Sequence, residues 1–249
     1  MLARRSVVRT LRQPAMVVPS LVFPLMLLSI NSSGLDSATQ LPGFPTDSYF
    51  QFALAITFVQ GALFSANSAG TNVASDIESG FLNRLSLTPL RRVALMMGQL
   101  AGIVALGLIQ ALTFLIVGVA FGAGIETGLA GAAVIVFFSL VISLAFGCIG
   151  AFVALRSGSG EAVQGVFPLF FAALFLSSMA LPRDLIETDW FRTVADWNPV
   201  SYMLELIRSL MIDGWDPEAL ALGFACAGGL AVVALVAASS ALRTRMVRT

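Results

Sequence analysis

The sequence contains no histidine and no lysine, and each of its 14 basic residues is an arginine. Without histidine the chain lacks the usual general base and a common metal ligand, and without lysine it cannot form a Schiff base. A nucleotide-binding P-loop also needs its lysine, so the chain by itself is not a conventional ATPase. Cys148 and Cys226 both lie in apolar runs and are interpreted as small buried residues, not as a disulfide pair or metal site.

Charge of either sign is scarce. Only 11% of the residues are charged and 57% are hydrophobic, whereas about 25% of the residues of a soluble domain are charged. The mean hydropathy is +0.90. So short a chain cannot hide this much apolar surface from water, but a lipid bilayer can surround it. The sequence therefore predicts an all-α, polytopic membrane protein with a single transmembrane domain over residues 1–249.

Six apolar runs are candidates for membrane-spanning helices. A bilayer core of about 30 Å needs about 20 helical residues. The candidates are residues 15–30, 50–74, 93–121, 131–155, 162–181 and 218–242. The first run is short and contains Pro19 and Pro24, so a secretory signal peptide is the alternative interpretation. The internal prolines and the even number of spans favour a retained span.

Residues 1–13 precede the first run and have the pattern of an amphipathic helix. The arginines lie on one face and small or apolar residues on the opposite face (Arg5, Arg9 and Arg12 against Ala3, Val7 and Leu11). Such a helix could rest at the headgroup level, with its arginines toward anionic lipid or a partner. It could equally be a simple positively charged anchor.

The charges divide between the two sides that six spans define. One side has eleven arginines and three acidic residues, and the other has three arginines and eleven acidic residues. The eleven are Arg4, Arg5, Arg9, Arg12, Arg84, Arg91, Arg92, Arg156, Arg243, Arg245 and Arg248. Because arginine collects on the cytoplasmic side, we expect both termini in the cytoplasm, in the plasma (inner) membrane of a bacterium. Every tryptophan and tyrosine falls at the outer side, where such rings prefer the membrane interface.

The cytoplasmic loop of residues 75–92 has the most specific pattern. Taken alone, it is an amphipathic connector on the membrane surface, which Thr88-Pro89 ends. It also resembles the signature of type-2 ABC transporter permeases, in the drug-exporter branch typified by daunorubicin-resistance permeases. The residues that carry this resemblance are Glu78, Gly80, Leu82, Leu85, Thr88, Pro89 and Arg92, and Arg84 lies between them as a further candidate for the coupling contact. The resemblance implies a coupling helix that docks onto a separate ATPase subunit, and the alternative is an ordinary connector.

The outer segment of residues 182–217 has too few consecutive apolar residues to cross the bilayer. It is predicted to be a re-entrant or interfacial helix pair. Asn198-Pro199 opens an amphipathic helix and Arg208 closes it. The same permease family carries an Asn-Pro-x-x-Tyr-like element followed by an arginine before its last span. The resemblance therefore implies that Asn198, Pro199, Tyr202 and Arg208 belong to a cap over the translocation path.

Several residues inside the spans are candidates to line that path. In the second span one narrow arc holds Gln60, Phe64, Asn67 and Thr71, and the fifth span holds Gln164, Phe167 and Phe171. An amide side chain inside the membrane is energetically unfavourable unless it is hydrogen-bonded to another group or in contact with water. The amides could line a path or hydrogen-bond a neighbouring helix. The phenylalanines could form an apolar substrate cleft or simply face lipid.

The resemblance implies the permease subunit of an ATP-driven ABC exporter that moves a hydrophobic or amphipathic, drug-like or lipid-like compound by alternating access. ATP and Mg would bind two copies of a separate ATPase subunit, and this chain would bind no cofactor or metal. A second permease chain, identical or paralogous, and membrane lipids would be its other partners, with no nucleic acid. The alternatives are export of a lipid-linked polysaccharide or other long amphiphile and, outside transport, a membrane assembly scaffold. The missing histidine and lysine argue against an enzyme, and span interiors without ionisable residues argue against an ion-coupled carrier.

Overall fold

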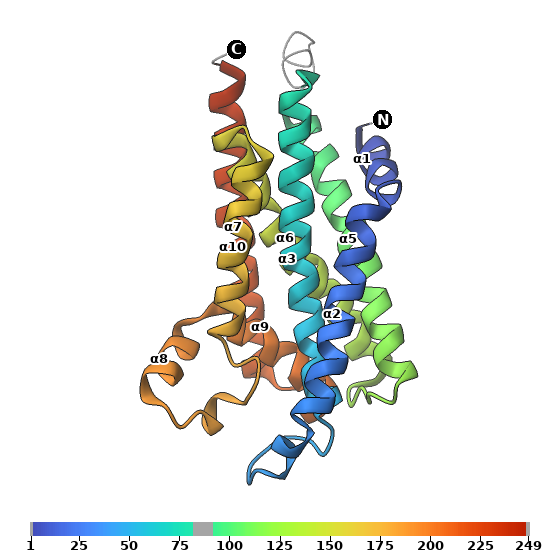
Figure 1. The fold of residues 1–249 in the computed structure, drawn as a ribbon, viewed down its shortest axis with the longest axis vertical. Helices are drawn as coiled ribbons and strands as arrows, with labels where there is room; N and C mark the ends of the chain where they lie inside the picture. The colour runs from blue at the N-terminus through green and yellow to red at the C-terminus, as the bar shows by residue number, and fades with distance from the viewer. Residues whose placement is uncertain (1, 82–91, 248–249) are drawn as a thin grey trace.

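The computed structural model describes residues 2–81 and 92–247, and these form helices joined by short loops, without any strand (Figure 1). Five helices are long and apolar enough to cross a membrane. They are α2 (Pro14–Gly34), α3 (Tyr49–Glu78), α5 (Arg92–Ala120), α6 (Gly128–Ser157) and α10 (Pro217–Val247). Within the described ranges, the predicted all-α, polytopic membrane fold is confirmed.

The fifth predicted span is the short one. Residues 162–181 were expected to be helical, whereas α7 (Gly160–Phe175) ends earlier and a turn follows it. Its 16 residues give a rise of about 24 Å, which is less than the bilayer core of about 30 Å. The count of six spans depends on α7 and stays a prediction.

The central helix of the bundle is α3. The most apolar window of α3 is 83% buried, whereas the corresponding windows of α2 and α10 are each 17% buried. Neighbours of α3 include α2, α5, α6 and α7. The approach of α6 is close enough that a Cβ atom on Gly150 would collide with the carbonyl oxygen of Ala66. A larger residue at position 150 would push the two backbones apart.

The described ends of the chain, the end of α3 and the start of α5 lie at one end of the bundle (Figure 1). Side-chain contacts also hold the start of α7 and the ends of α6 and α10 there: Glu78 with Gly160, and Arg245 with Leu155. The described arginine side chains of the predicted cytoplasmic side lie on these elements or directly next to them: Arg4, Arg9, Arg12, Arg156, Arg243 and Arg245. We call this the arginine-rich end.

The N-terminal helix α1 (Leu2–Leu11) forms as predicted, but it packs along α5. A Cβ atom on Gly102 of α5 would meet the side chains of Ser6 and Thr10, so this glycine allows α1 to come close. Thr10 is buried, whereas Arg4 and Arg12 are exposed. The helix therefore turns a small polar face to the protein, a contact that the amphipathic pattern did not predict.

The opposite end, which we call the acidic end, holds the short elements. They are the 3₁₀ helices η1 (Asp36–Gln40) and η2 (Arg183–Leu185), the helices α8 (Asp189–Trp197) and α9 (Pro199–Arg208), and the π-helical turn η3 (Ser209–Asp213). The helix pair expected in residues 182–217 is thus present as α8 and α9 (Figure 1). An apolar stripe that runs from α9 into η3 is fully buried, at Met203, Leu204, Ile207, Leu210 and Met211.

Candidate functional site

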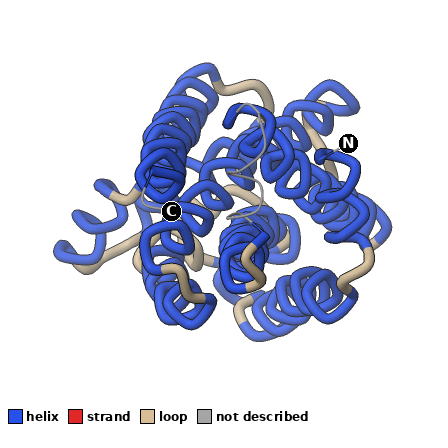
Figure 2. The backbone as a smooth tube through the Cα atoms, turned by 90° about the horizontal axis from the view of Figure 1, so that it is seen from above, coloured by secondary structure: helices blue, strands red, loops and turns tan. Residues whose placement is uncertain are grey.

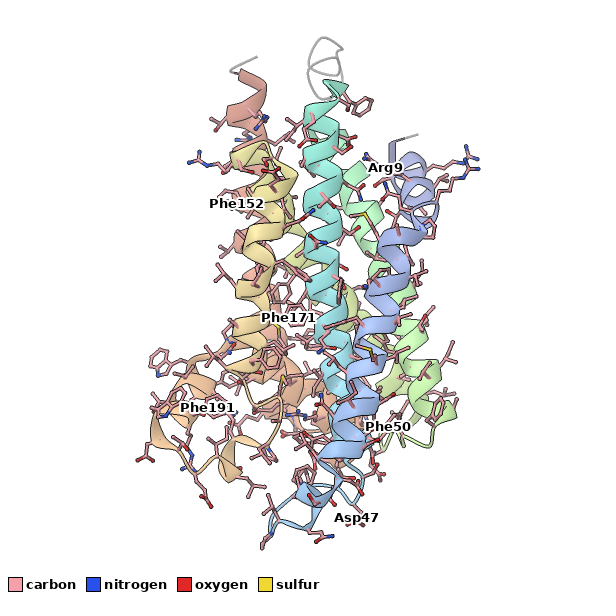
Figure 3. All side chains as sticks on the ribbon, in the orientation of Figure 1. Arg9, Asp47, Phe50, Phe152, Phe171 and Phe191 are labelled. Atoms are coloured by element: carbon pink, nitrogen blue, oxygen red, sulfur yellow. The ribbon has the colours of Figure 1, made fainter. Side chains whose placement is uncertain are left out.

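Four phenylalanine side chains from three helices meet partway along the bundle, where Figure 3 labels Phe171. Phe64 of α3 has its ring centre 5.8 Å from Phe23 of α2, 5.4 Å from Phe167 and 6.3 Å from Phe171 of α7. Phe23 and Phe171 are 5.9 Å apart. These edge-on and tilted contacts are favourable for aromatic pairs. We call Phe23, Phe64, Phe167 and Phe171 the phenylalanine cluster.

The structure brings together three of the predicted path residues and adds one. Phe64, Phe167 and Phe171 were singled out from the sequence, and Phe23 was missed. Because α2 is apolar on every side, its pattern does not distinguish the residue that faces α3. The predicted path residue Gln164 is exposed on α7 and lies outside the cluster.

Two amides on the same helix as Phe64 lie one turn before and one turn after it. Gln60 is only 2% exposed, and its Oε1 atom has no hydrogen-bond partner among the described residues. The Oδ1 atom of Asn67 is likewise buried and unpaired within the described structure. Thr71 differs, because its hydroxyl donates to the carbonyl oxygen of Asn67 at 2.8 Å. Buried acceptors without a donor are costly, so these two oxygens are the unsatisfied polar atoms nearest the phenylalanine cluster on α3.

At the arginine-rich end, an ion pair connects α1 to the last turns of α3. Arg9 donates from Nη1 to Oδ1 of Asp76 at 2.6 Å, and Figure 3 labels Arg9 at this end. The pair borders a cavity of about 70 Å³ lined also by Ser6, Asn72 and Gln99. Pockets for drug-sized ligands are about 300–1,000 Å³. This cavity suits water and is too small to be a substrate site.

The predicted coupling residues are only partly described. Glu78 is exposed and its Oε1 atom accepts a hydrogen bond from the backbone N–H of Gly160, at 3.4 Å, at the start of α7. Gly80 has a φ of +67°, which glycine adopts readily. The positions Leu82, Arg84, Leu85, Thr88 and Pro89 lie outside the described residues. Arg92 begins α5, and its side chain is also outside them.

At the acidic end, Asn198 joins α9 to α7. Its Oδ1 atom accepts from the N–H of Val200 at 2.9 Å and caps the N-terminus of α9, where Pro199 fits the first turn. Its Nδ2 group donates to the carbonyl oxygen of Ala173, in the last turn of α7, at 2.6 Å. One side chain therefore starts one helix and satisfies the end of another.

Arg208 is the most deeply buried charged residue of the described chain, at 5% exposure. Its guanidinium donates to the carbonyl oxygens of Ser178 at 2.6 Å, Met179 at 2.7 Å and Phe52 at 3.3 Å. Its Cζ atom also lies 3.6 Å from the centre of the Phe52 ring. Burial lowers the pKa of Arg208 to about 9, which leaves it charged at neutral pH.

These contacts explain why α7 ends at Phe175. The turn after α7 exposes carbonyl groups that would be unsatisfied away from water. Arg208 binds two of them, and the hydroxyl of Tyr49, at the start of α3, donates to a third, that of Ala180, at 2.9 Å. The sequence predicted Arg208 at this end but did not indicate Tyr49 as its neighbour.

Tyr202 belongs to a second, more exposed group at the same end. Its hydroxyl donates to the carbonyl oxygen of Asp196 at 2.8 Å, and Arg183 lies 4.4 Å above its ring. Arg183 also pairs with Glu205 at 2.6 Å. Burial raises the pKa of the Glu205 carboxyl, although the positive charge of Arg183 opposes this shift. The four predicted cap residues, Asn198, Pro199, Tyr202 and Arg208, therefore lie together at the acidic end.

The long apolar helices indicate a multi-pass membrane protein, with the short α8–α9 pair at its acidic end. The family profile described as ABC-2 type transporter matches residues 1–212. The chain belongs to the ABC-2 type transporter family and is a transmembrane ABC transporter permease. Members of this family normally work with an ABC ATPase subunit and are generally not catalytic themselves.

Two curated relatives are similar over most of their length. A protein of Cyanophora paradoxa named "Putative transport permease ycf38" is 25% identical over 211 residues, covering 84% of this chain and 72% of the relative. A protein of the same name from Porphyra purpurea is 27% identical over 212 residues, covering 83% of this chain and 71% of the relative. The names of both relatives agree with a transport role.

Proposed function

We propose that this permease exports an apolar or amphipathic compound from the cytoplasm or the inner leaflet, and that the compound passes along the face of α2, α3 and α7. The phenylalanine cluster with its two unpaired amide oxygens carries this proposal. Aromatic rings bind apolar surface, and the oxygens of Gln60 and Asn67 accept a hydrogen bond. The compound that fits is uncharged or weakly basic, with a flat apolar body and a hydroxyl or amine donor.

In the present conformation the four rings of the cluster contact one another, so a compound passes only if α2 or α7 moves away from α3. This movement is the alternating-access step. The loop of residues 75–92 would transmit it from an ATPase, and the α8–α9 pair would cap the path at the acidic end. A small drug-like compound requires only a local opening, whereas a lipid-linked polysaccharide requires a groove open along its length.

The proposal also includes the partners and the orientation. ATP and Mg bind two copies of a separate ATPase subunit, and this chain binds no cofactor. A second permease chain, identical or paralogous, completes the path. The arginine-rich end faces the cytoplasm of a bacterium across its plasma membrane, because arginine is retained on that side.

Reconstitution with the ATPase in lipid vesicles tests the proposal. A fluorescent apolar dye with an amine group is the probe, and ATP-dependent dye export is measured. We expect Phe64→Ala and Asn67→Leu each to reduce export about tenfold, because each removes about 1–2 kcal/mol of contact. The matched control is Phe137→Ala, since Phe137 on α6 is 59% exposed and outside the cluster.

Dye export by both variants at the wild-type rate would exclude the cluster as the path. ATP-dependent movement of a lipid-linked saccharide without any dye export would favour the long-amphiphile alternative. The absence of transport of either probe, with the ATPase bound, would favour a scaffold.

A further inference from the structure

The helix α8 has a face that the rest of the protein leaves uncovered. Trp190, Val194 and Trp197 are 63%, 37% and 85% exposed. At about 100° per residue, these three side chains lie within about 60° of arc on one side of the helix. Two exposed tryptophans and a valine on one face are unusual for a surface that meets only water.

The other two sides of α8 have different surroundings. Ala195 is fully buried and Phe191, which Figure 3 labels on this helix, is partly buried, so this side faces the protein. The polar side holds Asp189, Arg192, Thr193 and Asp196. The apolar half of α8 is therefore wider than the part that η2 and α9 cover, and the exposed tryptophans continue its apolar surface.

The position of α8 along the bundle is fixed by a hydrogen bond. Asn198 follows Trp197 directly, and its Nδ2 group donates to Ala173 in the last turn of α7. The apolar helix α7 ends two residues later, at Phe175, which is 55% exposed. The end of α8 thus lies level with the end of an apolar helix of the bundle, where a membrane interface is expected.

The direction of α8 agrees with this level. It projects sideways from the bundle in Figure 1, and it is the short helix at the far left when the bundle is seen end-on in Figure 2. The surroundings of a transmembrane bundle at that place are the lipids of one leaflet. Trp215, two residues before α10, is also exposed at this end, by 54%.

We propose that α8 is an interfacial helix that inserts Trp190, Val194 and Trp197 into the headgroup–acyl boundary of the leaflet at the acidic end. Tryptophan prefers this boundary because its ring is apolar and its N–H can bond to water or headgroups. The helix has two acidic residues and one arginine, and that arginine donates to the carbonyl oxygens of Ile186 and Asp184. Its attachment is thus aromatic, and anionic lipid is not required.

Tryptophan fluorescence tests the proposal directly, because the chain has only three tryptophans. A variant with Trp190→Phe and Trp215→Phe keeps Trp197 alone. The full chain is reconstituted in phosphatidylcholine vesicles that carry bromine either near the headgroup end or near the methyl end of the acyl chain. We expect stronger quenching by the shallow bromine, little quenching by aqueous iodide, and no change when phosphatidylglycerol or salt is added.

Two adjacent substitutions provide the matched control. Val194→Asp places a charge on the exposed apolar face, whereas Thr193→Asp places the same charge on the polar side. We expect Val194→Asp to lower the quenching of Trp197 by shallow bromine about twofold or more, since an unpaired charge is unfavourable among the acyl chains. Thr193→Asp should leave the quenching unchanged.

Two results would overturn the proposal. Strong quenching by iodide without quenching by brominated lipid would mean that α8 lies in water. The second result combines two observations. Brominated lipid would quench only at high dilution of the chain in the vesicles, and at low dilution a Trp197→Cys variant would cross-link between copies. Together they would mean that a second copy of the chain covers this face.

Discussion

The two ends of the bundle differ in how deeply their polar contacts are buried. At the arginine-rich end, partly exposed side chains join neighbouring helices, as in the ion pair of Arg9 and Asp76 and the contact of Glu78 with Gly160. At the acidic end, the buried Arg208 and the half-buried Asn198 bind backbone carbonyl groups, beside the partly exposed ion pair of Arg183 and Glu205. A partly exposed ion pair contributes little to stability, whereas an unsatisfied buried carbonyl is costly.

This difference suits the proposed transport cycle. The end that an ATPase would push must change shape at low cost, and weak, water-exposed contacts allow this. The end that caps the path must return to one geometry, and specific backbone hydrogen bonds define it. If the comparison is right, substitutions at the acidic end should destabilise the protein, and substitutions at the arginine-rich end should change mainly its coupling.

Arg208→Met should have the largest effect. The carbonyl oxygens of Ser178 and Met179 would lose their short hydrogen bonds, at about 1–3 kcal/mol each. We expect the free energy of unfolding to fall by about 3 kcal/mol in mixed micelles, and less for Arg208→Lys, which keeps a donor. Wild-type stability of Arg208→Met would show that the turn after α7 does not depend on this residue.

Asn198 should rank second, and two variants separate its two roles. Asn198→Ser keeps an acceptor for the cap on Val200 and is too short to reach Ala173, whereas Asn198→Ala removes both contacts. We expect losses of about 1 and about 2 kcal/mol respectively. Equal losses in the same unfolding measurement would mean that the hydrogen bond to α7 contributes nothing.

The ion pair of Arg9 and Asp76 should contribute less. In a double-mutant cycle of Arg9→Ala and Asp76→Ala, we expect a coupling energy below about 1 kcal/mol that shrinks as salt is added. The cycle is needed because each substitution alone also removes other contacts of its residue. If the coupling energy between Arg9 and Asp76 were several kcal/mol and independent of salt, the contacts at the arginine-rich end would be as strong as those at the acidic end.

Glu78→Arg should change the stability of the protein least, but it should clearly weaken binding of the ATPase subunit. If residues 75–92 dock onto an ATPase, reversing this charge should reduce co-purification of the ATPase and ATP-dependent export. The matched control is Glu161→Arg, because Glu161 is exposed at the start of α7 at the same end. Equal ATPase binding by wild type and both variants would leave the loop an ordinary connector.

The path and the cap were predictable from the sequence to different degrees. The arc of Gln60, Phe64 and Asn67 follows from helical periodicity, and the structure indeed places the three on one side of α3. Phe23 was not predictable, because an all-apolar helix gives no sign of which face is covered. The early end of α7 was also missed, because the residues that satisfy its turn, Tyr49 and Arg208, are far away in the sequence.

The sequence by itself determined the class of protein, the helical fold and the division of charge between two ends. These follow from total apolar content and local spacing, because a bilayer accepts only apolar helices and arginine stays on one side. Only the tertiary structure decided which helices meet and what each polar group binds. Arg208 bonds to Phe52 across 156 positions of the chain, and no local pattern encodes a contact between a side chain and the backbone of another helix.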